Sequence, residues 1–141
     1  MLKINKSQVS KFVKGSGDTN PLHMDDLYAR KTPFGKQVLH GVLILLKSLT
    51  HLDVSHTLRI EKLSLELFHA AFLDQEYRVQ IEFKTENKGI ITVLDEDVPI
   101  LQAKINFCEI IVKQQPKYKI SSSKNIPTET CCYFSIDNFS V

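Results

Sequence analysis

The chain has 141 residues, a length that fits about one domain. Hydrophobic residues make up 43% of it and charged residues 24%, which is typical of a globular domain and excludes a disordered chain. The 18 basic and 16 acidic side chains leave a net charge of only +2. We therefore expect no nucleic-acid partner, because such proteins need a clustered basic face.

The sequence also argues against a membrane protein and against a metal site. Residues 1–6 lack the apolar core of a signal peptide, and the longest apolar run, residues 38–46, is far shorter than the roughly 20 residues that span a bilayer. An odd number of cysteines with an adjacent pair fits a reducing compartment, and no His or Cys spacing is typical of metal binding. The cysteines are Cys108, Cys131 and Cys132. We expect a cytoplasmic protein with no metal and no cofactor.

The first elements in chain order are short. Residues 7–14 predict a helix with Ser7 as a possible N-cap, and the Gly-, Asn- and Pro-rich residues 15–21 predict a loop. A second short helix is expected through Ala29, capped by Asp25 or Asp26. The first part of the chain therefore consists of short helices joined by a glycine-containing loop.

Residues 38–51 predict the main helix. Their apolar side chains cover nearly every direction of a helical wheel, so we expect this helix to be buried on nearly all sides. A strand is the rival interpretation, but the run is long and lacks a period of two.

The residues that follow predict an antiparallel sheet. Residues 77–83 and 101–107 alternate between apolar and polar side chains, and residues 86–89 form a hairpin turn. In the strand predicted at 58–68 the apolar phase slips at residues 61–62, which indicates a bulge or a late start. We predict an α+β domain over residues 1–112, in which the antiparallel sheet wraps around a long central helix.

Residues 113–141 change in character and form a separate tail or linker in this interpretation. Residues 132–136 are compatible with one more strand, which either docks on the domain or opens an absent module. The sequence leaves both alternatives open.

The loop at residues 16–25 carries the candidate chemistry. It presents Asp18 and His23 five residues apart, and Pro21 stiffens the chain between them by fixing its own φ and extending Asn20. A carboxylate and an imidazole at one small target suit general acid–base work. Taken alone, such an aspartate is more often a turn or cap residue, and such a histidine more often a structural group.

A wider pattern gives this loop its specificity. Over about residues 9–112 the chain resembles the MaoC-like (R)-specific enoyl-CoA hydratases, and the resemblance is strongest up to residue 49. It implies a hot-dog fold, in which an antiparallel sheet wraps a central helix. The matching positions are Phe12, Ser16, Gly17, Asp18, Asn20, Pro21, Leu22, His23, Asp25, Ala29, Leu39, His40 and Gly41.

The resemblance also implies roles for individual residues. Asp18 and His23 match the catalytic pair that activates one water, and Gly41 matches the residue whose backbone N–H polarises the thioester carbonyl. Asn20 matches a position that shapes the loop. For His40 we expect a hydrogen bond that orients the start of the helix, with substrate contact as the alternative.

The implied activity is reversible hydration of trans-2-enoyl thioesters to (R)-3-hydroxyacyl thioesters, carried on coenzyme A or acyl carrier protein. The expected assembly is a homodimer. The alternatives are a non-catalytic acyl-thioester-binding or partner domain and a hot-dog thioesterase. Residues 68–75 lack the Pro and Gly-Asp that the family commonly has there, so we expect a different local strand geometry.

Overall fold

The computed structural model describes residues 1–54 and 58–109, all of which lie in one unit, Met1–Ile111. The predicted tail at 113–141, with its possible strand, lies outside the described residues. The division into a domain and a tail therefore stays a prediction.

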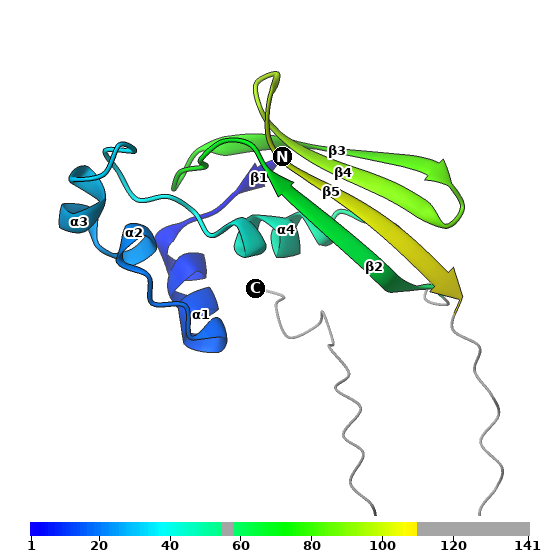
Figure 1. Cartoon of the computed structure of the whole chain (residues 1–141), viewed down its shortest axis with the longest axis horizontal. Coiled ribbons are helices and arrows are strands. Elements are labelled where there is room, and N and C mark those ends of the chain that lie inside the picture. Colours follow the sequence, from blue (N-terminus) through cyan, green and yellow to red (C-terminus); the bar gives the residue numbers. More distant parts are fainter. Residues whose placement is uncertain (55–57, 110–141) are drawn as a thin grey trace, which may run out of the picture. The chain divides into compact units, whose positions relative to one another are not determined.

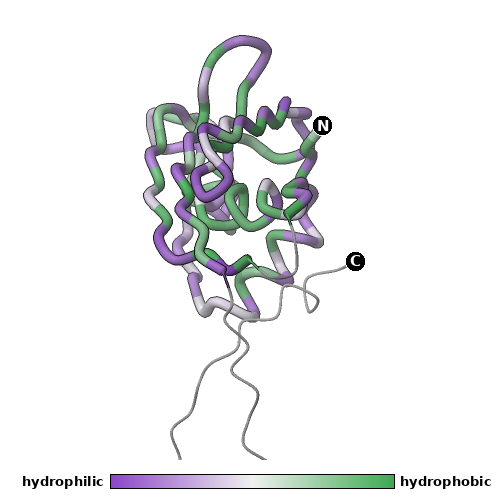
Figure 2. The backbone as a smooth tube through the Cα atoms, turned by 90° about the vertical axis from the view of Figure 1, so that its right-hand side faces the viewer, coloured by the Kyte–Doolittle hydropathy of each residue, from purple (hydrophilic) through white to green (hydrophobic). Residues whose placement is uncertain are grey.

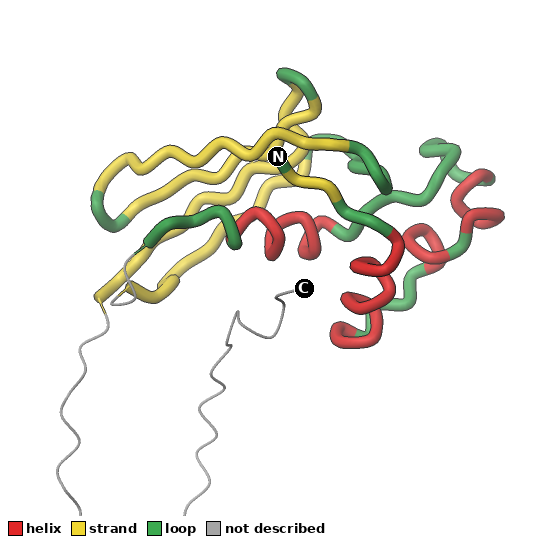
Figure 3. Tube along the Cα trace, turned by 180° about the vertical axis from the view of Figure 1, so that it is seen from behind, coloured by secondary structure: helices red, strands yellow, loops and turns green. Residues whose placement is uncertain are grey.

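The described chain forms four helices and five strands (Figure 1). All strand pairs are antiparallel, and the sheet order is β1-β3-β4-β5-β2. Figure 3 shows the helices α1–α3 together at one end of the sheet. The elements are β1 (Leu2–Lys3), α1 (Lys6–Ser16), α2 (Pro21–Met24), α3 (Asp26–Arg30), α4 (Gly41–Leu49), β2 (Leu58–Leu67), β3 (Glu76–Thr85), β4 (Lys88–Asp95) and β5 (Val98–Glu109).

The alternating strands build the core as predicted. Inward side chains of β4 and β5, such as Ile91, Val93 and Leu101, are fully buried, while neighbours such as Lys104 are exposed. The predicted bulge in β2 is confirmed, because the register between β2 and β5 shifts between Ile60 and Lys62. This α+β arrangement places one face of the sheet against α4, which contacts β4 and β5.

The helix predicted over residues 38–51 is shorter than expected. Val38 forms an isolated bridge with Phe72, and the Leu39 N–H donates to the carbonyl oxygen of Ala71 at 2.7 Å. These two pairings hold residues 38–39 in an extended conformation, so α4 begins only at Gly41 and ends at Leu49. The central helix therefore has nine residues.

The expected burial of α4 on nearly all sides is confirmed, with one exposed residue as the exception. Leu43, Ile44 and Leu45 are buried, whereas Val42 remains 52% exposed. In Figure 2 the apolar helix appears as the green coil near the middle of the view. No helix in the described part of the chain is long and apolar enough to cross a bilayer.

Helix α1 starts earlier and ends later than the sequence predicted, at Lys6–Ser16 instead of residues 7–14. Its N-cap is Asn5 and not Ser7, because Asn5 and Gln8 exchange side-chain and backbone hydrogen bonds in a capping box. The helix continues through Ser16, which was predicted to be loop, and stops at Gly17 with φ +74°. That left-handed conformation favours glycine and sends the chain into the candidate loop.

Candidate active site

The Asp18 loop is held by short-range hydrogen bonds. The N–H of Asp18 donates to Ser16 Oγ at 3.2 Å, and the Asp18 Oδ1 accepts the N–H of Asn20 at 3.2 Å. One carboxylate oxygen is therefore used to hold the turn. The other, Oδ2, is left for partners from elsewhere in the fold.

His23 lies on a helical turn where the sequence predicted only loop. Asn20 is the N-cap of α2, with its Oδ1 accepting the N–H of Leu22 at 3.0 Å, and Pro21 is the first helical residue. An Asn followed by Pro is a signal for a helix start that could have predicted this turn. Asn20 thus shapes the loop as expected, and Asp25 caps α3 as one of the two candidates.

A backbone carbonyl fixes the ring of His23. His23 Nδ1 lies 2.6 Å from the carbonyl oxygen of Val38. Because a carbonyl oxygen only accepts, Nδ1 carries the proton in the neutral ring and Nε2 keeps its lone pair. The extended residues before α4 therefore set which nitrogen of His23 can exchange a proton.

His40 is buried between the candidate residues. Its side chain is 3% exposed, and neither ring nitrogen has a hydrogen-bond partner among the described residues. The nearby acceptor is Asp18, whose Oδ2 lies 3.7 Å from His40 Nε2. The expected hydrogen bond that orients the helix start is therefore absent from this part of the chain, because the ring turns toward Asp18 and does not cap α4.

Aromatic rings enclose His40 from two sides. Its ring stacks on His23 with centroids 3.9 Å apart and planes 30° from parallel, and Phe12 lies 4.9 Å away at 60°. Burial, and then the neighbouring His23, lowers the pKa of His40, while Asp18 opposes this shift. We therefore treat His40 as a neutral imidazole at neutral pH.

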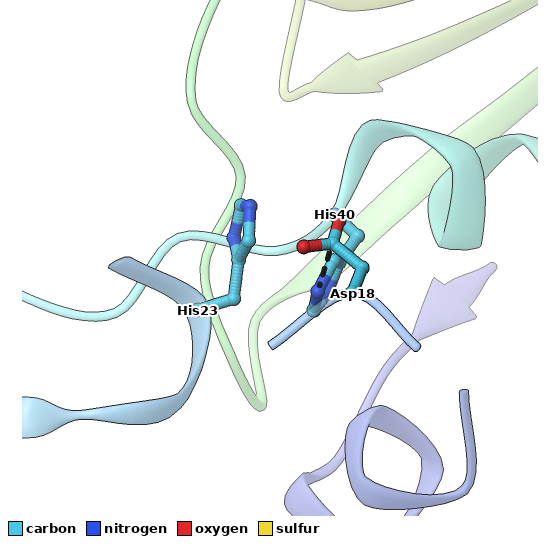
Figure 4. Close-up of side chains that lie close together, drawn as sticks. All are labelled: Asp18, His23 and His40. Atoms are coloured by element: carbon cyan, nitrogen blue, oxygen red, sulfur yellow. Dashed lines mark ion pairs between the residues drawn. The ribbon is translucent and has the colours of Figure 1, made fainter. Parts of the chain in front are cut away.

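The three side chains converge as Figure 4 shows. One carboxylate oxygen of Asp18 and one ring nitrogen each of His23 and His40 lie within 4.8 Å of one another. A water that hydrogen-bonds two groups at about 2.8 Å each can bridge a gap of that size. Asp18 and His23 are thus close enough to hold one water between them.

The same cluster is a poor cage for a metal ion. Zinc needs donor atoms at about 2.0–2.1 Å whose lone pairs point at one centre. The lone pairs of an imidazole lie in its ring plane, and the planes of His23 and His40 are stacked only 30° from parallel. The two rings therefore do not aim at a common point.

A cavity of about 400 Å³ extends from His23, one member of this cluster, to the start of α4. His23 and Gly41 both line it, together with apolar residues from the end of β2 and from the stretch after it. The N–H groups in the first turn of a helix have no acceptor within the helix, and no side chain of the described residues caps α4. The backbone N–H of Gly41 is thus available to a negatively polarised oxygen.

Several residues that wall this cavity were not predicted as site residues. Their type gave no signal, since an exposed phenylalanine or leucine is common at a surface. His69 is exposed and also lines the cavity. The added wall residues are Phe34, Leu67, Phe68, His69, Ala70 and Ala71.

An antiparallel sheet packed on a short central helix, with an Asp–His pair beside the start of that helix, defines a hot-dog domain. The family model described as MaoC like domain matches residues 1–85, which is more than half of the chain. The chain therefore belongs to the MaoC-like domain family.

Solved structures support the same fold. An (R)-hydratase from A. caviae involved in PHA biosynthesis has a TM-score of 0.60 and 22% identity, covering 75% of this chain and 88% of that one. An R-hydratase from Pseudomonas aeruginosa in the unliganded form has a TM-score of 0.64 and 17% identity, covering 90% of this chain and 86% of that one. These likenesses establish the hot-dog fold that the sequence resemblance implied.

One curated relative matches over a short stretch. It is a 3-hydroxybutyryl-CoA dehydratase from Methylorubrum extorquens, 40% identical over 40 residues. The match spans 28% of this chain and only 26% of that enzyme.

Proposed function

We propose that this protein is a hydro-lyase that reversibly hydrates trans-2-enoyl thioesters to (R)-3-hydroxyacyl thioesters. Asp18 and His23 activate the water, and the backbone N–H of Gly41 binds the thioester carbonyl oxygen. No cofactor or metal takes part in this proposal. The membership in the MaoC-like family and the geometry of the cavity support it.

The observation that carries the proposal is the cavity shared by His23 and Gly41. His23 lines one side of it, with Asp18 close behind in the same cluster, and the start of α4, which no described side chain caps, lines the other. Hydration of an enoyl thioester needs both at once, because a proton leaves the water that attacks C3 and is added at C2 while negative charge grows on the carbonyl oxygen. Helix N-termini stabilise such charge.

The reaction balances with these groups alone. One member of the Asp18–His23 pair removes a proton from water as its oxygen bonds to C3, and the electrons of the double bond move onto the carbonyl oxygen as an enolate. The Gly41 N–H stabilises that oxygen. The enolate then collapses as C2 takes from the Asp18–His23 pair the proton that the pair removed from water, so the net change is addition of one water.

The proton exchange at His23 takes place at Nε2. The Val38 carbonyl occupies Nδ1–H, so Nε2 is the ring nitrogen that can accept a proton and return it. Asp18 accepts in the same way through Oδ2. Because both groups act on one water, the effects of removing them should not add independently.

Purified protein with crotonyl-CoA tests the activity directly. We expect the ultraviolet band of the conjugated thioester to decay without release of free thiol, and chiral analysis to give the (R)-3-hydroxy product. Release of thiol would instead indicate a thioesterase, and neither signal would indicate a non-catalytic binding domain. Both of these results contradict the proposal.

Two substitutions test the assigned roles. Asp18→Asn and His23→Ala should each lower kcat by about 10²–10⁴-fold, the range of one acid–base role. Both side chains are at least partly exposed, so the melting temperature should change little. Asp26→Asn, a surface carboxylate paired with Arg30, is the matched control and should retain the native rate. Near-native turnover in either site variant would contradict the roles.

The carrier and the assembly belong to the same proposal. The substrate is a thioester of coenzyme A or of acyl carrier protein, and the enzyme works as a cytoplasmic homodimer. Parallel assays with crotonyl-CoA and crotonyl acyl carrier protein compare the two carriers through kcat/KM.

A further inference from the structure

His40 is a buried polar side chain that the proposed mechanism does not use. With 3% exposure it has little access to water, and both ring nitrogens lack a partner in residues 1–54 and 58–109. Buried polar groups are nearly always hydrogen-bonded, so an exception of this kind needs an explanation.

The ring of His40 contacts both members of the catalytic pair, each in a different direction. Its face stacks on His23 at 3.9 Å, and its edge points Nε2 toward Asp18 Oδ2 at 3.7 Å. The ring of Phe12 also packs against it, with centroids 4.9 Å apart. A single side chain therefore touches the imidazole and the carboxylate that must hold one water.

The two carboxylate oxygens of Asp18 face different partners. Oδ1 accepts the N–H of Asn20, while Oδ2 faces His40 Nε2 beyond normal hydrogen-bond length. Asp18 is half exposed on the loop after Gly17, so its side chain is the partner with room to move.

We propose that His40 is a positioning residue for the catalytic pair: its Nε2–H points at Asp18 Oδ2 and donates to it once the mobile Asp18 side chain closes the gap, and its ring face fixes the plane of His23. This inference rests on the proposed function. His40 does not touch the reacting atoms in it. Its effect passes through Asp18 and His23.

Three substitutions separate the two contacts. His40→Phe keeps the stacked ring and removes the donor, His40→Gln keeps an N–H near the place of Nε2 and removes the ring, and His40→Leu removes both. Loss of an orienting partner commonly costs 10–100-fold in activity, so we expect kcat of His40→Leu to fall by about that factor with KM within about twofold. Partial rescue by Phe and by Gln, each above Leu, supports the two separate roles.

The control is His51→Phe, because His51 is an exposed histidine just beyond the other end of α4. It should leave kcat and KM unchanged. Native kcat in all three folded His40 variants would overturn the inference.

A spectroscopic measurement keeps the inference testable even where a variant fails to fold or the wild type fails to hydrate crotonyl-CoA. Long-range ¹H–¹⁵N correlation spectra of the wild-type histidine rings near neutral pH should show His40 with its proton on Nε2 and His23 with its proton on Nδ1. In Asp18→Ala the preference of His40 for Nε2–H should weaken. An Nδ1–H tautomer of His40 in the wild type would overturn the inference whatever the activity, whereas absent hydration with these tautomers would contradict the proposed function alone.

Discussion

Gly41 lies where a side chain would fill the cavity beside its own N–H. A Cβ at this position would stand 2.7 Å from Leu67 Cδ1 and 2.9 Å from Cδ2. Leu67 is 58% exposed, so its side chain can move aside. A larger residue at position 41 should therefore reduce activity more than folding stability.

We predict that Gly41→Ala folds normally and lowers kcat/KM for crotonyl-CoA by about 10²-fold, the loss typical of a displaced reacting group. The added methyl and the displaced leucine occupy space in front of the helix start. Leu67→Ala combined with Gly41→Ala should recover part of the loss, measured as kcat/KM of the single and double variants. Failure of the double variant to recover would show that contact with Leu67 is not the cause.

His40 also links stability to pH. An exposed histidine in the unfolded chain titrates near 6.5, and burial lowers the pKa of His40 below that value in the fold. As pH falls below about 6.5, the unfolded chain binds a proton at this residue before the folded chain does, so the free energy of unfolding decreases.

His40→Phe removes this titration, so its melting temperature should fall less than that of the wild type between about pH 7.5 and pH 5. Thermal melts at both pH values measure the difference. His51→Phe should retain the wild-type dependence. An equal pH dependence in His40→Phe and the wild type would contradict the link.

Local sequence patterns were enough to identify the candidate residues, but they did not predict which distant residues these side chains contact. Asp18 and His23 stand in one loop, and the Asp25 cap needs only its own neighbours, so short-range rules apply to them. The burial of His40 depends on Phe12, which is far away in the chain. No pattern along the sequence indicates that a histidine in this place lacks hydrogen-bond partners among the residues that the structure describes.

Among the elements, the segment between β2 and β3 supports one wall of the cavity. The Tyr77 hydroxyl, on β3, accepts the N–H of Phe72 at 2.7 Å, and Tyr77 is 1% exposed. Phe72 in turn bridges to Val38, next to the residues that lead into α4. The hydroxyl of Tyr77 therefore fixes the backbone of Phe72, which pairs with the extended residues before α4.

Tyr77→Phe should lower the free energy of unfolding by about 1–2 kcal/mol, because the Phe72 N–H loses its acceptor. Urea denaturation measures this loss, and KM should rise as the wall loosens. Tyr28→Phe, at a tyrosine that is 49% exposed, is the control and should change neither. A native midpoint for Tyr77→Phe would show that water replaces the hydroxyl at no cost.

Strands were easier to predict than the bounds of α4. The alternation in β3 and β5 is a local property of a sheet with one buried face, and the phase slip in β2 marked its bulge. The start of α4 depends on pairing with residues 71–72, about thirty positions later in the chain. An apolar run alone does not show which of its residues will pair with a distant segment.

At the scale of the whole molecule, the described unit exposes apolar surface and open sheet edges. β2 pairs only with β5 in the described part of the chain, and Val42, Leu67 and Phe83 are each about half exposed. Open edges and apolar patches of this kind are commonly covered by another chain.

We predict a homodimer in solution, to be measured by sedimentation equilibrium over a dilution series. The expected mass is twice that of one chain and holds to low micromolar concentration. A single-chain mass throughout the series would contradict the prediction and would leave these edges facing solvent.

The Gly41 amide belongs to the peptide bond that links it to His40, so the amide that binds the carbonyl oxygen and the buried imidazole belong to adjacent residues. A ligand that binds this amide also restrains the neighbouring His40 side chain. Because His40 contacts Asp18 and His23, residues 18–23 should become less mobile even where the ligand does not contact them. Binding of a ligand in the cavity should therefore lower the mobility of residues 18–23. Slower deuterium uptake at their backbone amides would measure this. The Asp18–His23 pair and the Gly41 N–H would then become ordered together.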